Sequence, residues 1–172
     1  DAELAELMRV LRSEFDFSAA GEYAIEIDPR TVTPERVAFL AQLGFNRISL
    51  GVQDFDSEVQ RAIHRVQGFE ETQAVIRAAR KHGFRSINVD LIYGLPKQTL
   101  EGFARTLALV TGCDPDRVAL YSYAHLPAQF KPQRRIAEAD IPAPEAKLQL
   151  LTMAIERLVS AIRPDASQGE AP

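Results

Sequence analysis

Three apolar segments of the chain each carry one polar side chain near the carboxyl-terminal end. They are Glu26 in segment 22–27, Gln53 directly after segment 46–52, and Asp90 in segment 86–92. An unpaired carboxylate in an apolar interior costs several kcal/mol, so such a residue is hydrogen-bonded, paired or used in chemistry. Taken alone, each side chain could equally tie its strand to a neighbouring loop. Three at equivalent places favour one polar site, because parallel α/β barrels carry their chemistry at these strand ends.

The rest of the sequence indicates that helices and strands alternate. Pro34 suits the start of a helix that Gly44 ends, and Asp56 and Thr99 are suited to cap two more. Apolar spacing predicts helices over about 3–13, 34–43, 57–63, 70–82, 100–110 and 144–162, the last with Leu148, Leu151, Ile155, Leu158 and Val159, and strands over 22–27, 46–52, 86–92 and 117–121.

Four strands that alternate with helices predict a parallel sheet with right-handed crossovers. The chain has 172 residues, 46% of them apolar, which is enough for one core but short of the roughly 250 residues of a closed eight-stranded barrel. We therefore expect an α/β fold, a partial parallel β/α barrel over 1–162 that forms an open, TIM-barrel-like arc with an exposed strand edge. Segment 163–172 lacks apolar periodicity and is expected to be a disordered tail.

Composition argues against several classes of partner. The net charge of −4 does not favour nucleic acid or an anionic membrane, and no segment resembles a signal peptide or a transmembrane helix of about 20 residues. The sequence therefore predicts a cytoplasmic protein, which we expect to be a monomer.

Residues that bind metals or phosphate are sparse. The single cysteine, Cys113, excludes an internal disulfide and a cysteine cluster supplied by this chain alone. His64, His82 and His125 are too widely spaced for a motif such as HExxH. The turn at 94–96 is not expected to cradle phosphate, because its proline lacks a backbone donor.

Four sequence blocks carry a family resemblance. They are IEIDPR at 25–30, GFNRISLGVQDF at 44–55, NVDLIYGLPKQT at 88–99 and YAHLP at 123–127. In this order and spacing they resemble the oxygen-independent coproporphyrinogen III oxidases, a family of the radical S-adenosylmethionine superfamily, over about residues 4–160. The resemblance implies a partial β/α barrel with a 4Fe-4S cluster at its mouth.

The resemblance also implies a reaction. The reduced cluster cleaves S-adenosylmethionine to a 5′-deoxyadenosyl radical, which removes hydrogen from a propionate of coproporphyrinogen III. Loss of carbon dioxide and one electron leaves a vinyl group, and a second such step gives protoporphyrinogen IX. The electron donor is not specified by the sequence.

By the same resemblance, Glu26, Gln53, Arg65, Asp90 and Ala124 match the family's contacts to two molecules of S-adenosylmethionine. A carboxylate can accept ribose hydroxyls or hold an amino group, an amide donates and accepts, and an arginine fork suits the methionine carboxylate. Ala124 would offer backbone and little bulk. Without the resemblance, Arg65 would be interpreted as a solvated cation at a helix end.

The sequence departs from the family in what it lacks. The cluster-binding CxxxCxxC, a glycine-rich segment that holds the methionine group and the family's C-terminal domain are absent. The chain also starts without methionine, inside a helical pattern, so we expect a fragment of the oxidase that is inactive by itself.

Two alternatives stay open at this stage. The related haem chaperones keep the same barrel but bind and transfer haem, although Asp28, Asp54 and Lys97 resemble the oxidases. The second alternative is a degenerate protein that acts only as a binding or interaction module.

The role of a short basic run is also open. Arg134 and Arg135 could bind the propionates of the substrate or could be solvated surface residues.

Overall fold

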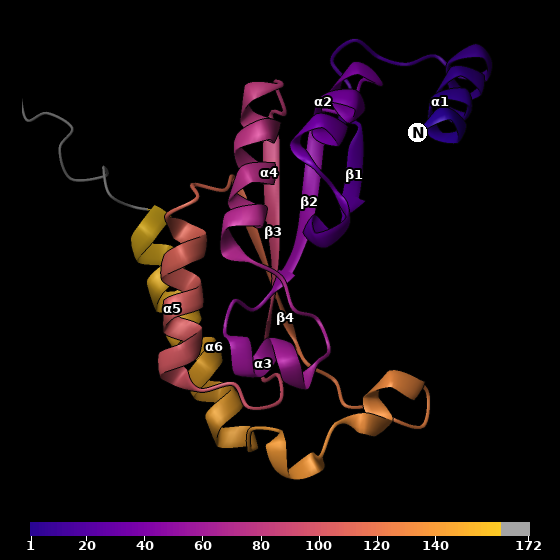
Figure 1. Cartoon of the computed structure of the whole chain (residues 1–172). Coiled ribbons are helices and arrows are strands. Elements are labelled where there is room, and N and C mark those ends of the chain that lie inside the picture. Colours follow the sequence, from indigo (N-terminus) through magenta and orange to yellow (C-terminus); the bar gives the residue numbers. More distant parts are fainter. Residues whose placement is uncertain (163–172) are drawn as a thin grey trace, which may run out of the picture.

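The sheet of the computed structural model, which describes residues 1–162, consists of four parallel strands. Their spatial order follows the chain, so each connection is a crossover that carries at least one helix (Figure 1). The predicted parallel sheet is confirmed. The strands are β1 (Ala24–Ile27), β2 (Arg47–Gln53), β3 (Ser86–Tyr93) and β4 (Arg117–Ser122).

The helices begin close to the positions that the sequence predicts. Side chains of Thr33, Asp56 and Thr99 accept hydrogen bonds from backbone N–H groups in the first turns of three of them. No helix within 1–162 combines the length and apolar character needed to cross a membrane. The helices are α1 (Ala2–Glu14), α2 (Pro34–Gln42), α3 (Ser57–Ala62), α4 (Phe69–Lys81), α5 (Leu100–Thr111) and α6 (Pro144–Ile162).

Several strand boundaries differ from the predictions by one or two residues, and β3 and β4 each end one residue later than predicted, at Tyr93 and Ser122. β1 starts at Ala24 instead of 22, because Tyr23 bonds to Asn46 in the turn before β2 and the ladder begins at the pair Ala24 and Arg47. β2 includes Gln53. Three short 3₁₀ helices, Pro29–Thr31, Lys131–Arg135 and Glu138–Asp140, were not predicted. The predicted disordered tail lies outside the described residues.

The core lies between the sheet and the helices on one of its sides. Helices α2, α4, α5 and α6 lie on that side in Figure 1. Alternate residues of the central strands point toward them, as the two-residue period of a strand requires. The buried apolar side chains there include Ile48, Leu50, Val52, Ile87, Val89 and Leu91 from the strands and Val37, Leu40, Val75, Phe103 and Leu107 from the helices.

Of the five apolar residues singled out on the last helix, Leu151 and Leu158 are half-buried, and Leu158 packs against the core, but the other three are exposed. Leu148, Ile155 and Val159 are exposed, whereas Leu150 and Ala154 are fully buried. α6 packs beside α5, and the small Ala154 allows a close approach of the two helices. Because the helix carries apolar residues on more than one side, its spacing did not determine which side is covered.

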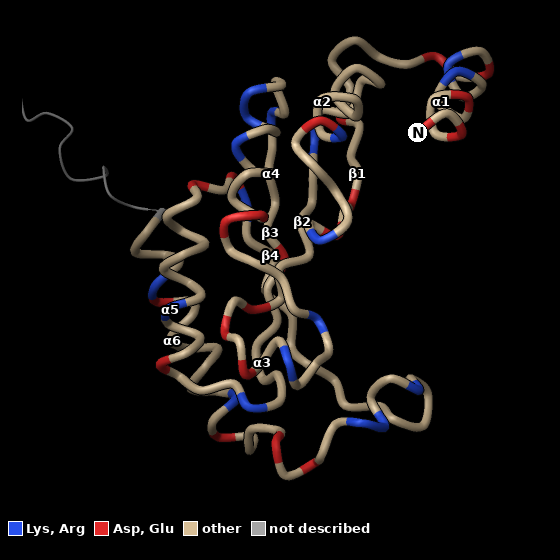
Figure 2. Tube along the Cα trace, in the orientation of Figure 1, with Lys and Arg blue, Asp and Glu red and all other residues tan. Residues whose placement is uncertain are grey.

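The opposite face of the sheet carries a group of polar residues beside the apolar Ile92 and Ala119. It carries Glu26 on β1, Ser49 on β2, and Asn88 and Asp90 on β3, which alternate with the core residues of each strand. Figure 2 shows that basic residues are found mainly on the helices and loops, including the loop between β4 and α6, and are few on the strands. The sheet therefore presents a polar surface near the carboxyl-terminal ends of its strands.

Gly94 lies at the end of β3 with a φ of 78°, beneath the side chain of Lys147 from α6. Replacing Gly94 by alanine is expected to lower the free energy of unfolding by about 2–3 kcal/mol, because the left-handed backbone is strained and the new methyl group would displace Lys147 from its hydrogen bond to Tyr123 O. Gly83 has a φ of 81° but open space around it, so its alanine variant is expected to lose only about 1–2 kcal/mol. Urea unfolding would measure both, and equal losses would contradict the displacement of Lys147.

Candidate functional site

Asp90 is buried but fully partnered. Its Oδ2 accepts a hydrogen bond from Ser49 Oγ at 2.8 Å, and its Oδ1 accepts one from Asn88 Nδ2 at 2.7 Å. Asn88 Nδ2 also donates to Ser49 Oγ at 2.8 Å. The three side chains form one cluster on the polar face, which gives Asp90 the partners that its place in an apolar strand requires. Its two oxygens retain further lone pairs for an external donor.

Gln53 ends β2 in an unusual backbone conformation. Its φ is 66°, and the register between β2 and β3 shifts between Gly51 and Gln53. Asp54 N donates to Val52 O at 2.8 Å, which closes a three-residue turn centred on Gln53. A positive φ at the centre of such a turn is rare and strained for a residue other than glycine. The turn redirects the end of β2.

Gly51 brings Gln53 and Arg65 close to the strand. A Cβ atom on Gly51 would lie 3.0 Å from Gln53 Nε2 and 3.2 Å from Arg65 Nη2. A side chain at this position would therefore push on both groups. Gly51 also pairs with Asp90 across the sheet, so the amide, the guanidinium and the carboxylate lie near one point of the polar face.

Arg65 folds back from the segment after α3 onto the end of β2. Its Nη2 donates to Gly51 O at 2.8 Å, and its Nη1 forms an ion pair with Asp28 Oδ2 at 3.2 Å. Burial lowers the pKa of Arg65 and the nearby charge of Asp28 opposes this, but a guanidinium stays charged. Its Nε is buried and has no hydrogen-bond partner within the described residues. An unsatisfied buried donor on a cation indicates a missing acceptor, best supplied by an anion.

Asp28 supports Arg65 and was not predicted as a site residue. It lies directly after β1 and receives hydrogen bonds from Arg30 through Nε and Nη2. The hydrogen bond from Arg30 is the main cause that lowers the pKa of Asp28. Asp28 is therefore ionised at neutral pH. The available signal was its place after a strand end, one position beyond the apolar residue Ile27.

Glu26 shares the polar face but not the hydrogen-bonded cluster. It pairs with Ser49 across the sheet, and Ser49 donates to Asp90. Side chains of paired residues lie on the same face, so Glu26 lies beside the cluster. Its side chain is exposed and is available to a ligand.

Ala124 lies just beyond β4, at the same end of the sheet as Gln53 and Asp90. Within residues 1–162, no hydrogen bond joins it to the other four predicted site residues. Its carbonyl accepts from Gln133 Nε2 at 3.0 Å, which holds the loop after β4. The structure thus brings Gln53, Arg65 and Asp90 together, places Glu26 beside them, and leaves Ala124 on a separate loop.

Sequence reasoning also missed Ser49 and Asn88, the direct partners of Asp90. Only Asn88 carries a detectable signal, since it is two residues before Asp90 and so shares its face of the strand. The pair Arg134 and Arg135 lies on an exposed 3₁₀ helix. Arg134 donates to Pro127 O at 2.9 Å, so it braces its own loop.

Comparison with known proteins identifies the superfamily. The model of the Radical SAM superfamily matches residues 1–110. The chain belongs to the radical SAM superfamily. It is 51% identical to the oxygen-independent coproporphyrinogen III oxidase of Pseudomonas aeruginosa over 92% of the chain and 35% of that protein. It therefore spans about a third of the length of the curated relatives it matches.

Solved structures agree on the fold. The radical SAM enzyme coproporphyrinogen III oxidase (HemN) from Escherichia coli is 48% identical and matches with a TM-score of 0.90, over 93% of this chain and 37% of that one. Elp3 from Methanocaldococcus infernus, at 19% identity, matches with a TM-score of 0.63 over 77% of this chain and 32% of that one. Because the sequence identity is low, the similarity to Elp3 supports the fold alone.

The polar face fits the organic cofactor of a radical SAM protein. S-adenosylmethionine carries a carboxylate, an amino group and two ribose hydroxyls. The buried, unpartnered Nε of Arg65 suits the carboxylate, and the free lone pairs of Asp90 suit the amino group or a hydroxyl. The amide of Gln53 can serve either as donor or as acceptor.

The chain does not fit the iron–sulfur cluster in the same way. A cluster of this kind is held by several cysteine thiolates, and the sequence has one cysteine. Cys113 is half-buried, and burial raises the pKa of its thiol, which disfavours the thiolate that binds metal. No group of three His, Cys, Asp or Glu residues within 1–162 is arranged to hold a metal ion. Ligands for a cluster must come from residues outside this chain.

Proposed function

We propose that this chain is the central part of an oxygen-independent coproporphyrinogen III oxidase. The reaction would convert coproporphyrinogen III to protoporphyrinogen IX by oxidative decarboxylation of two propionates. Support comes from identities of 48–51% to such oxidases over 87–93% of the chain. By itself the chain would be inactive, because it supplies no cluster ligands. We further propose a monomeric, cytoplasmic parent protein that acts on the porphyrinogen without nucleic acid or membrane, with an electron donor still to be identified.

In this proposal Glu26, Gln53, Arg65, Asp90 and Ala124 contact S-adenosylmethionine, two molecules of it in the whole enzyme. The observation that carries the assignment is the buried Nε of Arg65, which has no partner although the same guanidinium is fixed by Gly51 O and Asp28. A buried cationic donor needs an acceptor, and the carboxylate of a ligand is well suited to supply it. When bound, S-adenosylmethionine supplies the radical that removes hydrogen from the propionate.

The residues of the chain would have distinct tasks. Arg65 would bind the methionine carboxylate through Nε, while its two terminal nitrogens stay on Gly51 O and Asp28. Asp90, oriented by Ser49 and Asn88, would accept hydrogen bonds from the amino group or the ribose. Two bonds to one carboxylate leave it little freedom to rotate, so the acceptor is oriented before the ligand arrives.

The activity is tested on the full-length protein that contains this chain. After anaerobic reconstitution of its cluster, the protein is given coproporphyrinogen III, S-adenosylmethionine and a reductant. The expected result is release of two molecules of carbon dioxide per porphyrinogen together with 5′-deoxyadenosine. A reconstituted protein that cleaves no S-adenosylmethionine and leaves the porphyrinogen unchanged would contradict the proposal. Stoichiometric retention of haem by such a protein would instead indicate a haem chaperone.

A further inference from the structure

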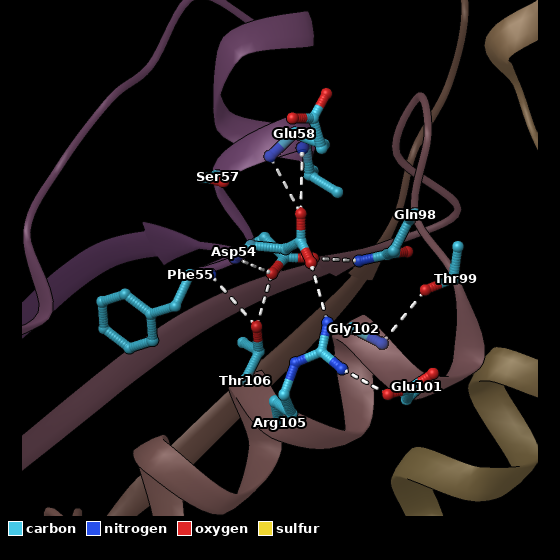
Figure 3. Close-up of polar contacts among 12 residues, drawn as sticks. Asp54, Phe55, Ser57, Glu58, Gln98, Thr99, Glu101, Gly102, Arg105 and Thr106 are labelled. Carbon is cyan, nitrogen blue, oxygen red and sulfur yellow. Dashed lines mark hydrogen bonds and ion pairs between the residues drawn. The ribbon is translucent and has the colours of Figure 1, made fainter.

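Asp54 is a buried carboxylate next to the candidate site. It has no exposed surface. Its Oδ1 accepts from Asp56 N at 2.8 Å and from the hydroxyl of Thr106, and its Oδ2 accepts from Gln98 Nε2 at 2.6 Å. Figure 3 shows Gln98 and Thr106 pointing at this carboxylate from the β3–α5 loop and from α5. Asp54 therefore joins three separate segments through one side chain.

The direction of each of these hydrogen bonds is fixed by a second contact. Thr106 Oγ1 accepts from Phe55 N at 3.1 Å, so its proton is free to go to Asp54. Gln98 Oε1 accepts from Gly94 N at 2.6 Å, so its NH₂ group faces Asp54. Burial raises the pKa of Asp54, and the donors oppose that shift. Since every partner donates, the network requires an acceptor on both oxygens, which the ionised carboxylate supplies.

The same network encloses the strained turn at Gln53. The carbonyls on both sides of Gln53 are held by buried glutamines, because Gln67 Nε2 donates to Val52 O at 3.0 Å and Gln60 Nε2 donates to Asp54 O at 2.9 Å. A positive φ at a residue other than glycine persists only where the surroundings enforce it. Asp54 is the last residue of the turn, and its side chain is anchored at both oxygens.

Gln98 extends the connection to the end of β3. Its Nε2 donates to Ile92 O at 3.0 Å as well as to Asp54. Ile92 is two residues beyond Asp90 on the same strand. The carboxylate of Asp54 thus sets the distance between the end of β2, which carries Gln53, and the end of β3, which carries Asp90.

We propose that Asp54 is a positioning residue for the cofactor site, which holds the turn at Gln53 against α5 through Thr106 and fixes its spacing from β3 through Gln98. It would not touch the ligand. The inference rests on the proposed function, since it assumes that Gln53 and Asp90 bind S-adenosylmethionine. A merely structural role would lower stability and leave the affinity for this ligand unchanged.

The test is Asp54→Asn in the full-length, cluster-reconstituted protein. An asparagine can still accept from Thr106 and Asp56 N, but its NH₂ group would face the NH₂ group of Gln98. The affinity for S-adenosylmethionine, measured by anaerobic equilibrium dialysis, is expected to fall by about tenfold or more. Iron and sulfide content is expected to stay the same. Undiminished affinity in Asp54→Asn would overturn the inference.

A second substitution provides the rescue. In Asp54→Asn/Gln98→Glu, the new carboxylate can accept from the asparagine NH₂ with one oxygen and from Gly94 N with the other. Affinity is expected to recover at least threefold relative to the single variant, but not fully, because the bond to Ile92 O is lost. A folded double variant that binds no better than Asp54→Asn would overturn the inference.

The matched control is Asp116→Asn. Asp116 also ties a loop to β3, since its Oδ2 accepts from Ile87 N at 2.7 Å and from Arg80, but it acts at the amino-terminal end of the strand. This variant is expected to be less stable and to bind S-adenosylmethionine normally. An equal loss of affinity in both variants would contradict a specific role for Asp54.

The failure of this inference can be distinguished from the failure of the proposed function. If the unsubstituted protein fails to bind S-adenosylmethionine, the proposed function itself fails. If only the comparison between variants fails, the proposed function stands.

Discussion

Asp90→Ala is expected to weaken the binding of S-adenosylmethionine by about 100-fold or more and to abolish decarboxylation in the full-length protein. Hydrogen bonds to a charged group contribute about 1.5–3 kcal/mol each, and Asp90 is expected to accept two from the ligand, so the loss corresponds to about 3 kcal/mol or more. Equilibrium dialysis of the reconstituted protein measures the affinity directly.

The fold is expected to survive this change. Ser49 and Asn88 lose their shared acceptor, but both are only half-buried and can bond to each other or to water. The free energy of unfolding should fall by about 1–2 kcal/mol. Asp16→Ala, at an exposed position before β1, is a control that should change neither quantity. Normal affinity in Asp90→Ala would remove Asp90 from the site.

Arg65→Ala is expected to weaken binding by about 30-fold or more with a small effect on stability. Asp28 keeps its hydrogen bonds to Arg30, so removal of Arg65 does not leave a buried charge without a partner. What is lost is the Nε donor for the ligand carboxylate, a charge-assisted bond worth about 2 kcal/mol or more. Equilibrium dialysis with S-adenosylmethionine measures the change.

Two further variants separate shape from charge. Arg65→Lys keeps the charge but cannot reach Gly51 O, Asp28 and a ligand at once, so it should recover little of the affinity. Arg61→Ala, four residues earlier on α3, removes an exposed arginine that within residues 1–162 pairs only with neighbours on its own helix, and this variant should bind normally. Full rescue by lysine would show that only the charge of Arg65 is used.

The sequence allowed the sheet to be predicted because each strand is a short, largely apolar segment that follows a predicted helix. Asp90 and Glu26 stood out for the same reason, as acids inside largely apolar runs. The partners of Asp90 were less evident, since serine and asparagine are common in strands and loops alike. The stripe on α6 misled because the helix has apolar residues on its exposed side too.

The backbone at Gln53 had no signal in the sequence. A left-handed φ is predictable at glycine but not at glutamine, where only tertiary hydrogen bonds enforce it. The network around Asp54 was equally hidden, because its members come from positions 54, 98 and 106, which contact only in the folded chain. Arg65 could be assigned from the sequence only through the family resemblance, whereas the structure supplies its unpartnered Nε.

The most direct measurement is an anaerobic crystal structure of the full-length, cluster-loaded protein with S-adenosylmethionine. Density for the methionine carboxylate within hydrogen-bond distance of Arg65 Nε, with Asp90 and Gln53 in contact with the same molecule, is the outcome predicted here. Density for S-adenosylmethionine elsewhere, with Arg65 Nε still unpartnered, would contradict the assignment of this polar face as the cofactor site.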